Sequence, residues 1–247
     1  MLLKFAVRHS KGWLLRTVAA SVALYPFLLG TQVSAQQTYV GLFDVYGGFT
    51  YLDSPNINLQ QRGFHIQAGV NPRTWLALGF DYSRLTGHTD ITPDQLTTAL
   101  QQQLGGQIAG LIAAGVIPPN YSLVVPFDAT TQTFAAGPQL MFRHWKPVTL
   151  FVRPSIGAIH EDATLHATDP VSAAIVTQLA PSGTKSDWTG FYGFGGGGEF
   201  NIGEHFSIRM QADYVRNHLF SDVLEKSRNT VRLSVGPAFH FGKNIVK

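Results

Sequence analysis

Apolar and polar side chains alternate with a period of two along eight segments of the chain. Within 206–214, for example, Phe206 and Ile208 alternate with Ser207 and Arg209. Because successive side chains of a β-strand point to opposite faces, this alternation predicts strands with one apolar and one polar face. The predicted strands fall within 43–51, 64–70, 76–83, 134–142, 149–156, 192–200, 206–214 and 231–241.

The links between these segments alternate in length. The predicted strands are longer than the about 5–6 residues of soluble strands and suit a tilted membrane strand of about 9–11 residues. Long strands with short turns at one end and long loops at the other are typical of outer-membrane barrels. We therefore predict an all-β fold: an eight-stranded antiparallel up-and-down transmembrane β-barrel with short helices in long extracellular loops. Tight links are predicted at 71–73, 143–147 and 201–205, and long links at 52–62, 86–130, 163–186 and 216–228.

Aromatic residues gather at the two ends of the apolar face. When the first strand is followed upward from the side of the chain termini, phenylalanines lie near the lower end and tyrosines near the upper end. Aromatic belts at both edges of an apolar band are typical of membrane barrels. The predicted lower girdle is Phe43, Phe142, Phe200, Phe206 and Phe241, and the predicted upper girdle is Tyr51, Tyr82, Tyr192 and Tyr214.

Three prolines conflict with regular pairing, because proline has no backbone N–H to donate to a β-ladder. Pro138, Pro154 and Pro237 all lie within predicted strands. A closed barrel offers no free edge at which to place them. We therefore expect bulges or local breaks of the ladder at these positions.

The first 35 residues have the pattern of an export signal. Basic residues without acidic ones occupy 1–16, an apolar run covers 17–29, and 33–35 supplies the small residues that signal peptidase needs. An apolar run of about 13 residues is too short to span about 30 Å of hydrocarbon, which argues against a membrane anchor. We predict a signal peptide at 1–35, a barrel domain at 36–247 and a final location in the bacterial outer membrane.

The composition narrows the classes of function. The chain has no cysteine, which excludes disulfides, thiolate metal sites and a cysteine nucleophile. Charged residues make up 13% of the chain, about half the usual share. Four of the 18 basic residues lie in the predicted signal peptide, so the rest of the chain has 14 basic and 15 acidic side chains. This balance gives no indication of nucleic acid as a partner.

Seven charged residues lie on the polar faces of the predicted strands, which would point into the barrel. Eight strands leave an interior that side chains fill, so charges buried there must pair. One interpretation is a salt-bridge network that replaces the apolar core of a soluble protein, and the other is a narrow, gated pore for ions or small solutes. The seven residues are Asp44, Asp81, Arg153, Glu199, Arg209, Asp213 and Arg232.

Two of the predicted loops carry helical patterns. Thr92, Pro93 and Gln95 have the spacing of a capped helix start, and Asp169-Pro170 is a smaller copy. Amphipathic helices do not leave apolar stripes in water. Either the two helices pack together as a lid, or they contact a partner, another copy, outer-leaflet lipid or an apolar ligand. The stripes are Leu96, Leu100, Leu104, Ile108, Leu111 and Ile112, then Val171, Ile175 and Leu179.

Two further features bear on chemistry. The run Gly195–Gly198 lies within a predicted strand and lacks the lysine and helix of a phosphate loop, so we interpret it as a curved wall. His218 and Ser221, with Asp222 and Glu225 nearby, would need hydrogen-bond contact to act as a hydrolase. The remaining histidines lack metal-ligand spacing, so we expect no metal and no cofactor.

The whole pattern resembles the OmpA-type eight-stranded outer-membrane barrels. The resemblance rests on the glycine-rich strand 193–200, the Gly-Pro pairs 137–138 and 236–237, and the aromatic signal 239–241. It implies a surrounding lipid that includes lipopolysaccharide, barrel-assembly machinery as a partner during biogenesis, and no catalysis. We expect a structural or surface-interaction role through the extracellular loops. The alternatives are a narrow pore and a lipid A-modifying barrel enzyme.

Overall fold

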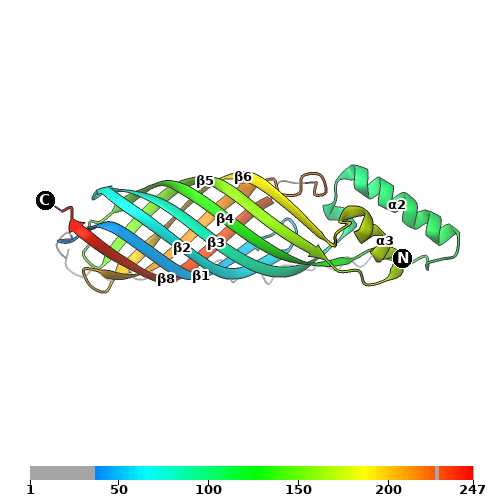
Figure 1. Cartoon of the computed structure of the whole chain (residues 1–247), viewed down its shortest axis with the longest axis horizontal. Coiled ribbons are helices and arrows are strands. Elements are labelled where there is room, and N and C mark those ends of the chain that lie inside the picture. Colours follow the sequence, from blue (N-terminus) through cyan, green and yellow to red (C-terminus); the bar gives the residue numbers. More distant parts are fainter. Residues whose placement is uncertain (1–36, 226–227, 247) are drawn as a thin grey trace, which may run out of the picture. The chain divides into compact units, whose positions relative to one another are not determined.

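A computed structural model describes residues 37–225 and 228–246, which form one closed β-barrel (Figure 1). Each strand pairs antiparallel with the next in sequence, and β8 pairs with β1 to close the sheet. The predicted eight-stranded antiparallel barrel is confirmed, while the predicted signal peptide lies outside the described residues. The strands are β1 Gly41–Ser54, β2 Leu59–Arg73, β3 Leu76–Ile91, β4 Val125–Phe142, β5 Val148–Leu165, β6 Thr184–Asn201, β7 Phe206–Asn217 and β8 Arg228–Asn244.

The two ends of the barrel differ in their connections. Short turns join β2 to β3, β4 to β5 and β6 to β7 at the end where β1 begins and β8 ends, which we call the terminal end. The opposite end, the loop end, carries the longer connections 92–124, 166–183 and 218–227. The long links predicted after the third, fifth and seventh strands are therefore present.

The long link predicted at 52–62 is wrong. β1 continues to Ser54 and β2 begins at Leu59, so four residues make the turn. The N–H of Ile57 donates to the carbonyl of Ser54 at 3.2 Å, and Asn58 has a φ of 53°. Asparagine tolerates this left-handed conformation, which lets the hairpin close tightly.

The apolar face of the strands changes sides along the barrel. In the middle of β3, Phe80 points outward and is exposed while Asp81 points inward and is buried. Toward the loop end, Leu85 is the inward, buried residue, and Arg84 and Thr86 point outward. The outer wall therefore changes from apolar to polar at this level. Other inward apolar residues beyond it are Leu59, Phe127, Ala129, Ile159, Ala163, Phe191 and Val215.

The prolines break the ladder locally, as predicted, and they do so without bulges. Pairing of β4 with β5 lapses between Ala136 and Leu140, where Pro138 lies opposite Pro154, and then resumes in the same register. Pairing of β1 with β8 lapses opposite Pro237 in the same way. Each proline stays paired on its other side, so every break is confined to one ladder.

The first loop helix differs from its prediction. A single helix starting at Thr92 is wrong: a 3-10 helix, η2 (Pro93–Gln95), ends in extended backbone at Leu96, and α2 (Thr98–Ala113) begins afterwards. Thr92 makes no side-chain cap hydrogen bond. Leu96 instead forms an isolated bridge with Leu224 in the β7–β8 connection. This contact with the neighbouring loop outweighs the local helix signal.

The second loop helix starts where it was predicted. Residues Pro170–Leu179 form α3, and the Asp169 carboxylate accepts from the N–H groups of Val171 and Ser172 at 2.8 and 3.0 Å. The hydroxyl of Ser172 is hydrogen-bonded back to the N–H of Asp169 at 2.9 Å, which completes a capping box. Figure 1 shows α2 and α3 at the loop end.

Candidate functional site

Charged side chains fill the barrel interior in layers, and the middle layer joins four of them. Arg232 lies 3.3 Å from Asp81 and 2.9 Å from Asp213. Arg153 donates to Asp81 and lies 3.6 Å from Asp213. The nearby imidazole of His65 lies 3.3 Å from Asp81. Two arginines between two carboxylates satisfy the requirement that buried charges be paired.

The layer toward the terminal end is centred on Arg209, which is fully buried. Its Nε donates to Glu199 at 2.7 Å and its Nη2 donates to Asp44 at 3.2 Å. The guanidinium also lies between the rings of Tyr46 and Phe151, 5.4 and 5.5 Å from their centroids. The cation therefore contacts two carboxylates and two aromatic rings, and this level of the interior is occupied.

The third layer, toward the loop end, was missed in the sequence. Arg228 donates to Glu161 at 2.7 Å, and the hydroxyl of Thr131 donates to the same carboxylate at 2.6 Å. Glu161 lies six residues after Ser155 and therefore on the same, inward face of the strand. Extending the predicted fifth strand beyond residue 156 would have found it. Together the three layers contain all seven predicted interior charges and add one ion pair.

The glycine run of β6 makes room for these layers. A Cβ at Gly195 would lie 2.0 Å from an oxygen of Asp213. At Gly197 it would lie 2.9 Å from the ring of Phe151 and 2.1 Å from a backbone oxygen of Met210. Side chains at these two inward positions would displace residues of the middle and terminal layers.

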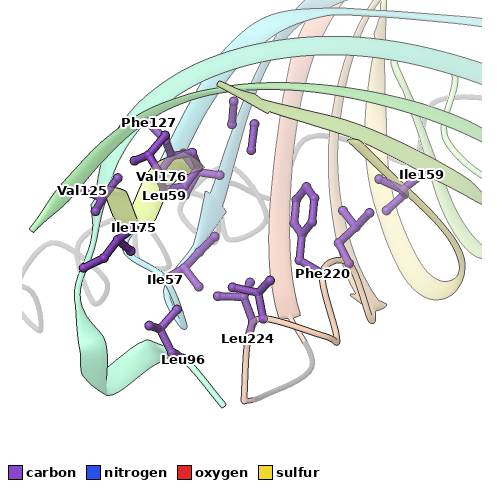
Figure 2. Packing of buried hydrophobic residues seen from close by; sticks show 14 of the residues in the cluster. Ile57, Leu59, Leu96, Val125, Phe127, Ile159, Ile175, Val176, Phe220 and Leu224 are labelled. Atoms are coloured by element: carbon purple, nitrogen blue, oxygen red, sulfur yellow. The ribbon is translucent and has the colours of Figure 1, made fainter. Parts of the chain in front are cut away.

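An apolar cluster closes the loop end of the barrel (Figure 2). Ile57 and Leu59 of the β1–β2 hairpin, Phe127 of β4 and Phe220 and Leu224 of the β7–β8 connection are all buried in it. Above the ion pair of the loop-end layer it leaves a cavity of about 50 Å³ with apolar walls. The cluster resembles the core of a soluble protein placed on a polar barrel.

The predicted stripes of the loop helices differ in how far they enter this cluster. Leu96, Leu104 and Ile175 are buried in it. Leu100, Ile108, Val171 and Leu179 pack against it and are partly buried. Leu111 and Ile112 are half-buried outside the cluster. Both helices therefore pack on the mouth of the barrel, and α2 extends beyond the apolar cluster.

The outer wall carries the residues predicted for the girdles. Phe43, Phe142, Phe200, Phe206, Phe241, Tyr192 and Tyr214 are exposed, and Tyr51 and Tyr82 are half-buried. At the level of the reversal, rings form a ribbon from β2 to β6. The ring centroids are 5.9 Å apart for Phe64 and Tyr82, 5.0 Å for Tyr82 and Phe134, and 6.2 Å for Phe134 and Trp188. Neither Phe134 nor Trp188 was predicted for a girdle: Phe134 begins the fourth predicted strand, and Trp188 precedes the sixth, which was predicted to begin at Tyr192.

Solved structures with the same arrangement exist. Neisserial surface protein A is similar with a TM-score of 0.52 at 12% identity, covering 81% of this chain and 97% of that one. The fold is that of the eight-stranded outer-membrane barrels. Ail of Yersinia pestis, at 11% identity, has a TM-score of 0.44 and covers 82% of this chain and 99% of its own. OprG of Pseudomonas aeruginosa, also at 11%, has a TM-score of 0.43 and covers 85% and 100%. No family model and no curated protein matches the sequence.

The acids weighed as partners of His218 and Ser221 in the alternative of a hydrolase have other contacts in the structure. The Asp222 carboxylate accepts from Lys185 at 2.7 Å, and Glu225 accepts from the first N–H of α2 at 2.9 Å. Both acids thus link connections at the loop end, and within the described residues neither is hydrogen-bonded to His218.

The described residues include no group of three or more His, Cys, Asp or Glu that could hold a metal ion. None of the described helices is long and apolar enough to cross a membrane.

Proposed function

We propose that this chain is an integral protein of the bacterial outer membrane, in which a sealed, non-catalytic barrel holds a helical cap at the cell surface. The outward wall supports membrane insertion, since large apolar side chains such as Phe80, Ile156 and Phe194 are more than half exposed. A continuous exposed apolar band suits lipid rather than water. In barrels of this type the longer connections lie outside the cell, which supports a cap on the outer side.

The layered interior is the observation that carries the sealed barrel. Arg153, Arg209, Arg228 and Arg232 cross the lumen to carboxylates on other strands, and all are at most 4% exposed. Opening a path would separate such pairs, and leaving one buried charge without its partner costs on the order of 3–5 kcal/mol. This barrier favours a structural role over the alternative of a narrow pore.

The composition of α2 supports a role in surface contact. Its 16 residues include no charged side chain, although most of them are exposed. Gly105, Gly106 and Gly110 have open space where a Cβ would lie. A helix with an uncharged exposed surface is unusual in water unless another surface covers it. We therefore assign contact with the surroundings to α2.

Cysteine labelling tests the location and topology, because the chain has no native cysteine. Ala109→Cys lies on the exposed part of α2, and Gly203→Cys lies in a terminal-end turn with open space around it. A membrane-impermeant maleimide should label Ala109→Cys on intact cells and Gly203→Cys only after lysis. The unboiled protein should migrate faster than the boiled one in SDS, since a closed ladder has no edge from which to unzip. Protein in the soluble fraction would contradict the proposal.

Conductance and lipid analysis separate the proposal from its alternatives. In planar bilayers the protein should show no discrete current steps, and Arg153→Gln and Glu199→Gln should leave that result unchanged. Steps whose size or ion preference follows the Glu199 charge would establish a pore. An altered lipid A profile that returns to normal with Ser221→Ala would establish a lipid-modifying enzyme.

A further inference from the structure

The outer wall of β2 and β3 carries two arginines just beyond the aromatic ribbon. In the register of these strands, Phe64 lies opposite Arg84 and Arg62 lies opposite Thr86. The two arginines are thus diagonal neighbours on the same face, with Cβ atoms on the order of 7 Å apart. Both side chains are exposed.

Further hydrogen-bond donors lie beside them on β4. Gln132 is opposite Arg84, and Thr130 is opposite Thr86. The hydroxyl of Tyr82 donates to Oε1 of Gln132 at 3.2 Å, so the amide nitrogen of Gln132 remains a donor. Two guanidinium groups, an amide and two hydroxyls therefore share one patch, which we call the donor patch: Arg62, Arg84, Thr86, Thr130 and Gln132.

The charge of the donor patch is not neutralised by an ion pair within the described residues. The Asp128 carboxylate, further from the ribbon, is hydrogen-bonded to His88 at 3.0 Å and to His166 at 2.8 Å. Asp53 of β1 lies opposite Gln60, one step along the wall from Arg62. The two cations of the patch therefore face a single nearby carboxylate, that of Asp53, which lies diagonally across from Arg62.

The height of the donor patch identifies its surroundings. On each strand it begins one outward position beyond the aromatic ring, with Arg62 after Phe64 on β2 and Arg84 after Tyr82 on β3, where apolar side chains stop pointing outward and polar ones begin. In a membrane this is the boundary between hydrocarbon and headgroups, where aromatic belts lie. Guanidinium groups bind phosphate through paired N–H donors. The site therefore combines phosphate donors with an apolar wall directly below it.

We propose that the donor patch binds a phosphate group of an outer-leaflet glycolipid of the lipid A class, with the acyl chains lying along the apolar wall. This inference rests on the proposed location in the outer membrane. The wall argues for a lipid over free phosphate, because Phe64, Ile66 and Phe80 continue the exposed apolar surface below the arginines. A soluble anion would use the cations and leave that surface unused.

Binding of bisphosphorylated lipid A to the purified, folded protein in detergent tests the proposal. The double variant Arg62→Gln/Arg84→Gln should bind about tenfold more weakly by native mass spectrometry, which is the size expected for lost charge-assisted hydrogen bonds at an exposed site. Arg73→Gln is the matched control, since Arg73 is an exposed arginine at the terminal end of the same strand. It should bind lipid A like the unaltered chain. Asp53→Asn should strengthen binding.

Two further arms fix the ligand. Fully dephosphorylated lipid A should bind the unaltered chain as weakly as the double variant binds the phosphorylated form. Inorganic phosphate in excess should displace little of the bound lipid A. If it displaced lipid A as effectively as added lipid A does, the choice of a lipid would be overturned. Unchanged binding by the double variant, or an equal loss with Arg73→Gln, would overturn the site. Labelling of Ala109→Cys on cells is independent of these arginines, so a failure of the proposed location would be recognised separately.

Discussion

The barrel interior and the mouth of the barrel are two cores built on opposite chemistry. The interior buries Arg209 completely between carboxylates, whereas the mouth buries Leu104 and its neighbours in an apolar cluster. The same eight strands continue through both regions, so the difference does not come from the fold. It follows the character of the outer wall: where the outer wall is apolar the inside is mainly polar, and where the outer wall is polar the inside is mainly apolar, apart from the buried Glu161–Arg228 pair. Burial alone therefore does not decide which residues fill a core.

The two cores should also respond differently to damage. Ion pairs and hydrogen bonds are specific to their partners, so removing one member leaves the other buried and unpaired. Apolar packing is not directional, and its loss is limited to the area and cavity involved. Each substitution below tests one side of this contrast.

The largest effect is expected in the interior. Arg209→Ala leaves Glu199 and Asp44 without their shared cation, and we expect a loss of about 3–5 kcal/mol in the free energy of unfolding. Urea unfolding in lipid vesicles, followed by loss of fast gel mobility, measures it. Asp222→Ala is the control, because it removes an exposed ion pair worth about 0–1 kcal/mol. An equally small loss for Arg209→Ala would show that water solvates the interior.

A second, more local effect is expected in the mouth. Leu104→Ala removes a buried side chain of the apolar cluster, which costs about 2–5 kcal/mol where cores are tightly packed. We expect faster hydrogen exchange in α2 and α3, with the heat-dependent gel shift of the barrel unchanged. Leu111→Ala, outside the cluster, should have little effect on exchange. Loss of the gel shift with Leu104→Ala would contradict the separation of the two cores.

A third effect concerns the space that the interior layers need. Gly197→Ala places a Cβ against a backbone oxygen of Met210 and the ring of Phe151, so we expect about 1–3 kcal/mol of destabilisation. The adjacent Gly198→Ala is a close control, since its Cβ would meet Leu150 at 3.4 Å, an ordinary contact. Vesicle unfolding of the two variants gives the comparison. Equal stability would mean that the inward wall is not tightly packed.

The sequence predicted the barrel well because period-two alternation is strong in the middle of each strand. The four carboxylates and three arginines of the terminal and middle layers were predicted from parity alone, and the structure brings all seven into ion pairs. The prolines were also informative, because an amino acid without a backbone N–H must interrupt a ladder wherever it lies.

The strand ends could not be found in the same way. The predicted strands follow one apolar face, and toward the loop end that face turns from outward to inward. Glu161, Arg228 and Trp188 lie at or beyond this reversal and were therefore missed. The hairpin at 55–58 was missed for the same reason, since polar outward residues such as Arg62 do not continue the apolar face of the strand. Contacts between loops, such as the bridge of Leu96 with Leu224, depend on residues far apart in sequence.

The smallest effect concerns the cap alone and depends on pH. Hydrogen bonds from the N–H of Ser172, the hydroxyl of Tyr121 and the N–H of Val171 lower the pKa of Asp169 below its ordinary value. A lowered folded-state pKa means that the carboxylate stabilises α3 above the pKa of the unfolded chain. This contribution is lost as pH falls through the folded value.

We therefore expect hydrogen exchange in α3 to accelerate below pH about 4, beyond the intrinsic pH dependence of exchange, while the barrel stays folded. Asp169→Ala should cost the cap about 1 kcal/mol at neutral pH, the usual value of an N-cap. Asp169→Asn is the matched variant, because its amide oxygen still accepts from the helix but does not titrate in this range. It should remove most of the acid response and keep part of the neutral-pH protection. If Asp169→Asn loosens in acid as the unaltered chain does, another group controls α3. The helices at the mouth would then respond to acid through their packing on the barrel and not through the N-cap residue Asp169.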